Sequence, residues 1–174
     1  MNSTVIPGEY RRQAMRGKGT QVDRPVLLFP PGFPSRRDAD GIAPPGMTVE
    51  LFLPSAFRSQ ILAEARIAYP RECCGLLEGS AEHITALHPT RNLAGRPDRF
   101  EIDPAEQFRL RREGRRIVGC YHSHPGGRAE PSPRDAEQAS EAGFLWLICA
   151  GTIGAHVWDG AGFRPLILRE TAAA

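Results

Sequence analysis

Residues 122–135 read HSHPGGRAEPSPRD and gather two histidines, a serine and an aspartate around a loop too rich in glycine and proline for one regular element. His122 and His124 end an apolar run, and at this spacing on a strand both imidazoles point to the same side. Asp135 follows a Ser-Pro pair and is expected in the first turn of a helix, where its carboxylate can supply a third ligand atom beside the two imidazoles. Two imidazoles and one carboxylate are the protein ligands of a catalytic zinc ion that leaves its fourth position to water.

The spacing beyond the two histidines makes the pattern specific. A lone His-x-His pair is weak support for a metal site, because strands often carry exposed histidines. Here it is followed by proline, a loop and Pro-Ser-x-x-Asp, and this longer pattern is far less probable by chance. The pattern therefore predicts a water-activating metal site at His122, His124 and Asp135. Gly126 and Gly127 would let the loop turn and let a substrate backbone approach closely.

This stretch resembles the zinc-binding signature of the JAMM (MPN+) metalloprotease family, also described as Mov34/MPN/PAD-1. The signature runs His-x-His-Pro, a loop and Pro-Ser-x-x-Asp, and every position of it is filled here. Upstream, YPRECCGLLEG is similar to the family's glutamate and Cys-Gly-Leu-Leu-x-Gly segment, and RNLAGRPDRFEIDP to its asparagine and Phe-x-Ile-Asp-Pro stretch. The resemblance covers roughly residues 48–168, with the length and order of the stand-alone prokaryotic members.

The resemblance implies a fold and a set of roles. The fold would be the cytidine-deaminase-like MPN fold, with zinc bound by His122, His124 and Asp135. Ser132 would hydrogen-bond the oxyanion of a tetrahedral intermediate, and Glu72 would be the general base that takes the proton of the attacking water. Zinc would polarise the scissile carbonyl and lower the pKa of water toward about 7.

The choice of proton acceptor depends on the resemblance. By position alone, Glu72 and Glu101 rank equally, since both lie near predicted strand ends. The resemblance favours Glu72, and its three rivals near strand ends or the loop are expected to be solvated surface groups: Glu78, Glu101 and Glu130. Ser123, between the two ligand histidines, is expected to point away from the metal.

Other conspicuous residues are expected to have structural or surface roles. Three further histidines lie in predicted strands or turns: His83, His88 and His156. One predicted helix carries a run of arginines that suits a charged face in water: Arg109, Arg111, Arg112, Arg115 and Arg116. Two tryptophans are expected to pack in the core or on an edge strand: Trp146 and Trp158.

The elements that must position the site read as an α/β domain with a mixed central β-sheet flanked by helices, of six or seven strands and three helices. A strand-like start near Met47 leads into a helix that ends at Pro70. A second helix begins at Asp103 and Pro104 with Phe108 on its apolar face, and a third begins at Ser132. Further strands are predicted at residues 73–79, 82–89, 98–103, 116–122, 144–151 and, twice, within 154–168.

Composition bounds the rest of the interpretation. The chain has 174 residues, of which 41% are hydrophobic, which suits one globular domain. Residues 1–46 are dense in proline, glycine and charge, and predict a disordered or over-extended N-terminal tail before a domain at residues 47–174. No run suits a membrane helix or a signal peptide, so a cytoplasmic location without a membrane partner is expected. The cysteines are expected to be reduced and buried: Cys73, Cys74, Cys120 and Cys149.

The resemblance implies a zinc-dependent peptidase or isopeptidase that hydrolyses an amide bond at the C-terminal Gly-Gly tail of a ubiquitin-like or sulfur-carrier protein. The alternative is a non-catalytic MPN scaffold or protein-binding module, but such relatives usually lack one or more ligands. A zinc deaminase would need His-x-Glu with Pro-Cys-x-x-Cys, which the chain lacks. A net charge of +2 without aromatic and basic interleaving argues against nucleic acid. Both a monomer and a homodimer stay open.

Overall fold

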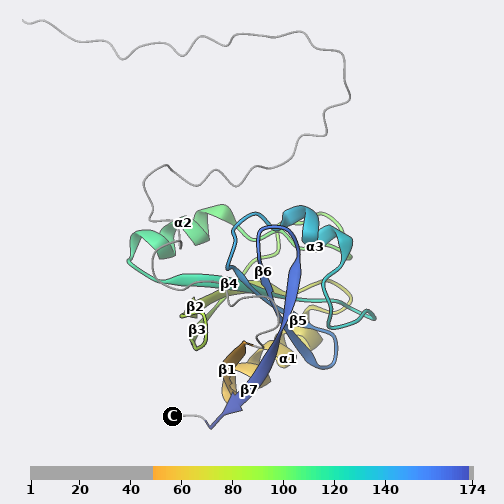
Figure 1. The fold of residues 1–174 in the computed structure, drawn as a ribbon. Helices are drawn as coiled ribbons and strands as arrows, with labels where there is room; N and C mark the ends of the chain where they lie inside the picture. The colour runs from red at the N-terminus through yellow and green to blue at the C-terminus, as the bar shows by residue number, and fades with distance from the viewer. Residues whose placement is uncertain (1–48, 173–174) are drawn as a thin grey trace, which may run out of the picture. The chain divides into compact units, whose positions relative to one another are not determined.

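The computed structural model describes residues 49–172, and the predicted N-terminal tail lies outside them. Within this part of the chain, seven strands form one sheet in the order β1-β7-β6-β5-β4-β2-β3 (Figure 1). The pairs β1/β7 and β4/β5 are parallel and the other neighbours are antiparallel. A mixed sheet with three helices confirms the predicted α/β class.

The strands are β1 (Glu50–Pro54), β2 (Cys74–Gly79), β3 (Ile84–Thr90), β4 (Ile117–Ser123), β5 (Leu145–Cys149), β6 (Ile153–Trp158) and β7 (Phe163–Thr171). The helices are α1 (Ser55–Ala68), α2 (Pro104–Arg112) and α3 (Pro133–Gln138). Helices α2 and α3 begin at the predicted cap-and-proline signals. In particular, Asp103 caps α2 by accepting from the Ala105 N–H, with Pro104 at the first helical position.

The sheet curls so that its two ends approach each other. Phe52 of β1 forms a parallel bridge with His83, just before β3, and its N–H donates to the Glu82 carbonyl at 2.6 Å. The Phe52 ring stacks on His83, with 4.8 Å between ring centroids. These contacts cover part of both edge strands, whose unpaired backbone groups would otherwise invite other chains.

The two faces of the sheet carry separate apolar clusters. On one face α1 buries Ile61 among strand residues such as Leu77 and Leu147, and the buried Tyr121 hydroxyl donates to Glu64 of α1 at 2.6 Å. On the other face, Leu110 of α2 packs with Leu76 and Ile117. Beside that contact lies the third cluster, made of Cys74, Phe100, Cys120 and Trp146. Strand β4 is buried along its whole length, so its C-terminal end is a rigid platform.

Two details of the predicted elements are wrong. Residues 98–103 form no strand beyond an isolated bridge between Ile102 and Asn92. The Glu101 carbonyl accepts from the Leu93 N–H at 2.9 Å, but the Glu101 N–H donates to the Asn92 side chain at 3.1 Å instead of continuing the ladder. On α2, Phe108 is 55% exposed and Leu110 is the buried residue. The sequence pattern does not reveal the buried face of α2, because its single buried leucine stands between two arginines, which hides the helical period.

The remaining expectations concern the cysteines and the membrane. All four cysteines are free, three of them are buried, and Cys73 is partly buried. Within residues 49–172, no helix has the length and apolar character needed to cross a membrane. The limits of the predicted domain and the cytoplasmic location stay predictions.

Candidate metal centre

Two of the predicted ligands come from the end of β4. His122 is fully buried, opposite Cys74 of β2 and Ile148 of β5 in the ladder. His124 follows the strand, and its N–H donates to the Cys149 carbonyl at 2.8 Å. Both histidine backbones are therefore fixed by neighbouring strands before any ligand is considered.

The third predicted ligand is fixed by a helix cap. Ser132 is the N-cap of α3; its Oγ accepts from the Asp135 N–H at 3.2 Å, and the Ser132 N–H donates to Asp135 Oδ2 at 2.6 Å. This reciprocal capping box holds the Asp135 carboxylate in one orientation. The Ser132 hydroxyl accepts in this arrangement, so its own proton remains available for donation.

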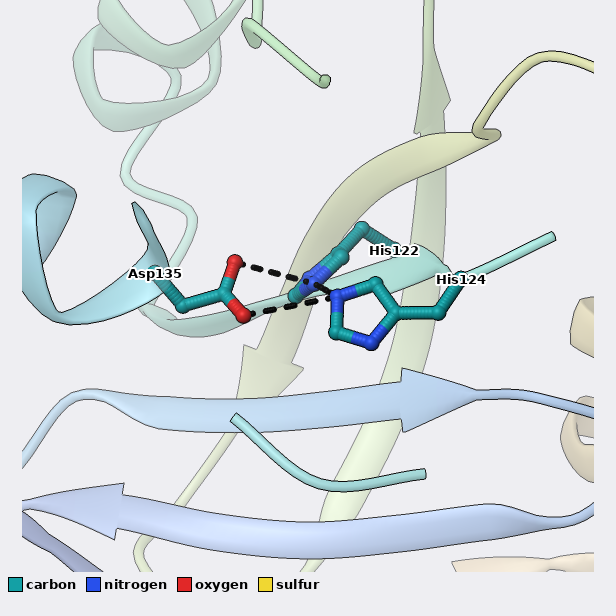
Figure 2. A group of neighbouring side chains, drawn as sticks. All are labelled: His122, His124 and Asp135. Atoms are coloured by element: carbon teal, nitrogen blue, oxygen red, sulfur yellow. Dashed lines mark hydrogen bonds and ion pairs between the residues drawn. The ribbon is translucent and has the colours of Figure 1, made fainter. Parts of the chain in front are cut away.

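The three side chains converge from β4, the loop after it and α3 (Figure 2). His122 Nε2 lies 2.9 Å from His124 Nε2 and 3.2 Å from Asp135 Oδ1, and His124 Nε2 lies 3.4 Å from Asp135 Oδ2. Donor atoms bound tetrahedrally to zinc at about 2.0–2.1 Å lie about 3.3 Å apart. The observed separations therefore fit a zinc ion with little rearrangement.

Hydrogen bonds and packing orient the two imidazoles. The Arg128 carbonyl lies 2.9 Å from His124 Nδ1, so it accepts from an Nδ1–H and directs Nε2 toward the site. The His122 ring stacks on Phe100 at 4.2 Å between centroids and meets the edge of Trp146. His122 Nδ1 is buried and has no hydrogen-bond partner among residues 49–172, so stacking orients this ring.

Charge in the cluster is concentrated on Asp135. Burial opposes ionisation of Asp135, but hydrogen bonds from His122 and His124 and the Ser132 N–H outweigh it and hold the pKa of the carboxyl far below its usual range. Burial lowers the pKa of His122 despite the neighbouring carboxylate. For His124 burial also opposes the charge, yet bonds to Asp135 and the Arg128 carbonyl raise its pKa. An ionised carboxylate beside a neutral His122 suits a cation.

Glu72 lies in the segment between α1 and β2, 7% exposed. Burial raises the pKa of its carboxyl to about 7; His124 opposes this shift and Asp135 adds to it. A carboxyl that titrates near neutral pH suits proton transfer. Glu72 also lines a cavity of about 510 Å³ together with Pro70, Pro97, Asp98, Arg99, His124, Pro125, Ser132, Pro133, Arg134, Asp135 and Gln138.

The rival glutamates lie elsewhere. Glu78 binds His88 at 2.8 Å and lies 3.7 Å from Arg115, and Glu130 pairs with Arg128 on the surface. Glu101 is exposed. None of the three lines the cavity, so geometry separates Glu72 from Glu101 where sequence position did not.

The remaining flagged side chains also lie outside the cluster. His83 stacks on Phe52, His88 pairs with Glu78, and His156 is buried against Phe163. Several arginines of the α2 region bind acidic partners: Arg109 with Glu106 and Glu113, Arg111 with Glu141, and Arg115 with Glu78.

Three contributors to the site had no role in the sequence interpretation. Phe100 stacks on His122, and Asp98 binds Arg134, the residue before Asp135, at 2.6 Å. Asn92 donates to the Glu72 carbonyl at 2.9 Å. The family-like stretch RNLAGRPDRFEIDP contains Asn92, Asp98 and Phe100, and this was the available signal.

The curled mixed sheet, with this side-chain cluster at the end of its inner strand β4, is a JAB-type α/β domain. The chain matches the family described as prokaryotic homologs of the JAB domain over residues 54–160, and it belongs to that family. The predicted family resemblance is thereby confirmed.

Individual relatives extend the comparison. The chain is 40% identical over 129 residues to a desampylase of Haloferax volcanii, covering 67% of this chain and 93% of that protein. It is 37% identical over 87 residues to a probable TtuB-protein conjugate cleaving protease of Thermus thermophilus, covering 47% of this chain and 55% of that protein. A protein of Desulfitobacterium hafniense with a known solution structure is 27% identical, with a TM-score of 0.63 over 71% of this chain and 94% of that chain.

Proposed function

We propose that the protein is a zinc-dependent isopeptidase or peptidase that hydrolyses the amide bond at the C-terminal Gly-Gly tail of a ubiquitin-like or sulfur-carrier protein. The observation that carries the proposal is the convergence of His122, His124 and Asp135, whose ligand atoms lie within 4.8 Å of one another, beside a cavity lined by His124, Asp135 and Glu72. Relatives named desampylase and probable TtuB-protein conjugate cleaving protease support the substrate class.

Zinc held by His122, His124 and Asp135 would supply Lewis-acid chemistry, polarising the scissile carbonyl and acidifying water. Glu72 accepts the proton of the attacking water and returns it to the leaving amine, a cycle that suits a carboxyl with a pKa of about 7. Ser132 donates a hydrogen bond from its hydroxyl to the oxyanion that forms on the carbonyl oxygen. The capping box keeps that hydroxyl at the N-terminus of α3 beside Asp135.

The main alternative is a non-catalytic scaffold. A scaffold needs neither a buried glutamate with a raised pKa nor a carboxylate fixed toward two imidazoles, and this chain has both. We extend the proposal to the domain limits: the metallopeptidase domain occupies residues 47–174, with residues 1–46 outside it. Turnover by the full chain, compared with a chain that begins at Met47, tests whether residues 1–46 inhibit the enzyme.

The proposal is tested by zinc content and by cleavage of a ubiquitin-like carrier bearing a peptide after Gly-Gly. The wild type is expected to bind about one zinc ion and to cleave, since residues 49–172 bring together one such set of three side chains. Glu72→Gln is expected to keep the metal and to lose roughly 100-fold to 10,000-fold in kcat, the usual contribution of a general base. His122→Ala is expected to lose both metal and activity. A wild-type protein that binds no zinc would leave the scaffold as the better interpretation.

A further inference from the structure

One peptide group beside the candidate base is held at both ends by side chains. The Glu72 carbonyl accepts from Asn92 Nδ2 at 2.9 Å, and the Cys73 N–H donates to Ser123 Oγ, also at 2.9 Å. The carbonyl and the N–H belong to the same planar peptide unit. Two hydrogen bonds at opposite ends of this plane fix its orientation.

Ser123 connects this peptide to the metal ligands. It lies between His122 and His124 on the chain, is 2% exposed, and its own N–H donates to the Cys73 carbonyl at 3.1 Å. In an antiparallel ladder the Cys73 N–H would return a bond to the Ser123 carbonyl, but here the hydroxyl accepts it. Successive strand residues face opposite sides, so the end of β4 presents His122 to one face and fastens Cys73 from the other.

Asn92 connects the same peptide to the segment that covers His122. Besides its bond to Glu72, Asn92 Nδ2 donates to the Arg99 carbonyl at 2.9 Å. Its Oδ1 accepts from the Ala94 N–H at 2.9 Å and from the Glu101 N–H at 3.1 Å. An asparagine amide has two N–H donors and two acceptor lone pairs, so all four are used. The bonds to Arg99 and Glu101 bracket Phe100, whose ring stacks on His122.

The Glu72 carboxylate itself is not anchored. Within residues 49–172 it makes no hydrogen bond, although it faces the cavity shared with His124 and Asp135. Its position relative to the ligands therefore depends on the backbone to which it is attached.

We propose that Asn92 and Ser123 are positioning residues that clamp the Glu72–Cys73 peptide and thereby hold the Glu72 carboxylate toward His124 and Asp135. The catalytic consequence of the clamp rests on the proposed function. The clamp itself does not, because its hydrogen bonds involve no metal and no substrate.

The first test is amide hydrogen exchange at Cys73, followed by NMR on the full-length, metal-free protein. Ser123→Ala and Asn92→Ala are expected to speed exchange of the Cys73 N–H by roughly 3-fold to 10-fold, the equilibrium value of one hydrogen bond. Asp159→Ala is the matched control, because Asp159 accepts from two backbone N–H groups in the β6–β7 turn. This control should leave Cys73 exchange unchanged. Unchanged exchange in both Ser123→Ala and Asn92→Ala overturns the inference.

The second test is steady-state cleavage by the zinc-loaded protein. Asn92→Ala and Ser123→Ala are expected to lower kcat roughly 10-fold to 100-fold, the cost of misplacing a reacting group, with KM and zinc content little changed. Asn92→Asp has the same shape but cannot donate to the Glu72 carbonyl, so it should fail like alanine. Ser123→Thr keeps the hydroxyl and should therefore retain most of the wild-type kcat that Ser123→Ala loses.

A double-mutant cycle separates positioning from general loss of structure. If Asn92 acts through Glu72, adding Asn92→Ala to Glu72→Gln lowers kcat no further, whereas independent effects multiply. Wild-type kcat in Asn92→Asp and Ser123→Ala overturns the inference while leaving the proposed function intact. If the wild type cleaves no carrier, the proposed function fails and the exchange experiment alone decides whether the clamp exists.

Discussion

Replacing Glu72 by glutamine is expected to stabilise the metal-free protein above neutral pH. Burial raises the pKa of this carboxyl from 4.5 to about 7 in the folded state. Between these values the folded protein keeps a proton that the unfolded chain has released. The free energy of unfolding therefore falls as pH rises through this window, and the whole penalty is present above the folded pKa.

The size of the effect follows from the two pKa values. Between pH 5 and pH 8, linkage gives roughly 2 to 3 kcal/mol of lost unfolding free energy from this one carboxyl. This is an upper value, because Glu72 lines a cavity that water can enter. Glutamine has nearly the same shape and no charge, so Glu72→Gln should lack this loss.

Urea unfolding at pH 5 and pH 8, with a chelator present, measures the difference. Relative to Glu72→Gln, the wild type should be less stable by a larger margin at pH 8 than at pH 5. Glu130→Gln is the control, because Glu130 is exposed and should change stability by less than about 0.5 kcal/mol at either pH. If the wild type instead gains stability over Glu72→Gln as the pH rises, Glu72 does not hold a proton in the folded state and the assignment of its role is refuted.

Three further outcomes are expected. Ser132→Ala removes the N-cap of α3 and the hydroxyl beside Asp135. It should lower the free energy of unfolding in urea by about 1 kcal/mol and lower kcat by about 100-fold to 1,000-fold. Unchanged kcat would contradict the oxyanion role. Gly119→Ala places a Cβ against the Leu145 carbonyl of β5, a backbone atom that strand pairing prevents from moving, and should cost about 2 kcal/mol or more in a denaturant titration. Chelation of the zinc-loaded enzyme should abolish cleavage and leave the far-ultraviolet circular dichroism intact; loss of that signal would show that the metal holds the fold.

The convergence of His122, His124 and Asp135 was predictable because its geometry is local. Two histidines at alternate strand positions face one side, and Ser-Pro followed by an acidic residue predicts a helix cap that fixes Asp135. Neither inference requires knowing which strands are neighbours. The parts that sequence reasoning missed depend on distant segments. Asn92 bonds to Glu72, 20 residues away, and Phe100 stacks on His122.

The same distinction explains the wrong strand at residues 98–103. The alternation of polar and apolar residues there satisfies a strand pattern, but Phe100 is buried because it covers His122, not because it joins a ladder. Similarly, which residue of α2 is buried depends on the strand side chains that face the helix. Leu76 and Ile117 pack against Leu110, and Phe108 is left under the Arg112 guanidinium at the surface.

The backbone of the candidate site is assembled without a metal. Hydrogen bonds within the sheet hold His122, the bond to Cys149 holds His124, and the capping box holds Asp135. The folding free energy thus orders the ligands in advance, so zinc binding does not have to supply the cost of ordering the chain. In small zinc domains the metal supplies that cost and its removal unfolds them. This chain instead has a seven-stranded sheet whose strands β4 and β5 are buried along their whole length beneath the site, so the three side chains are positioned without a metal.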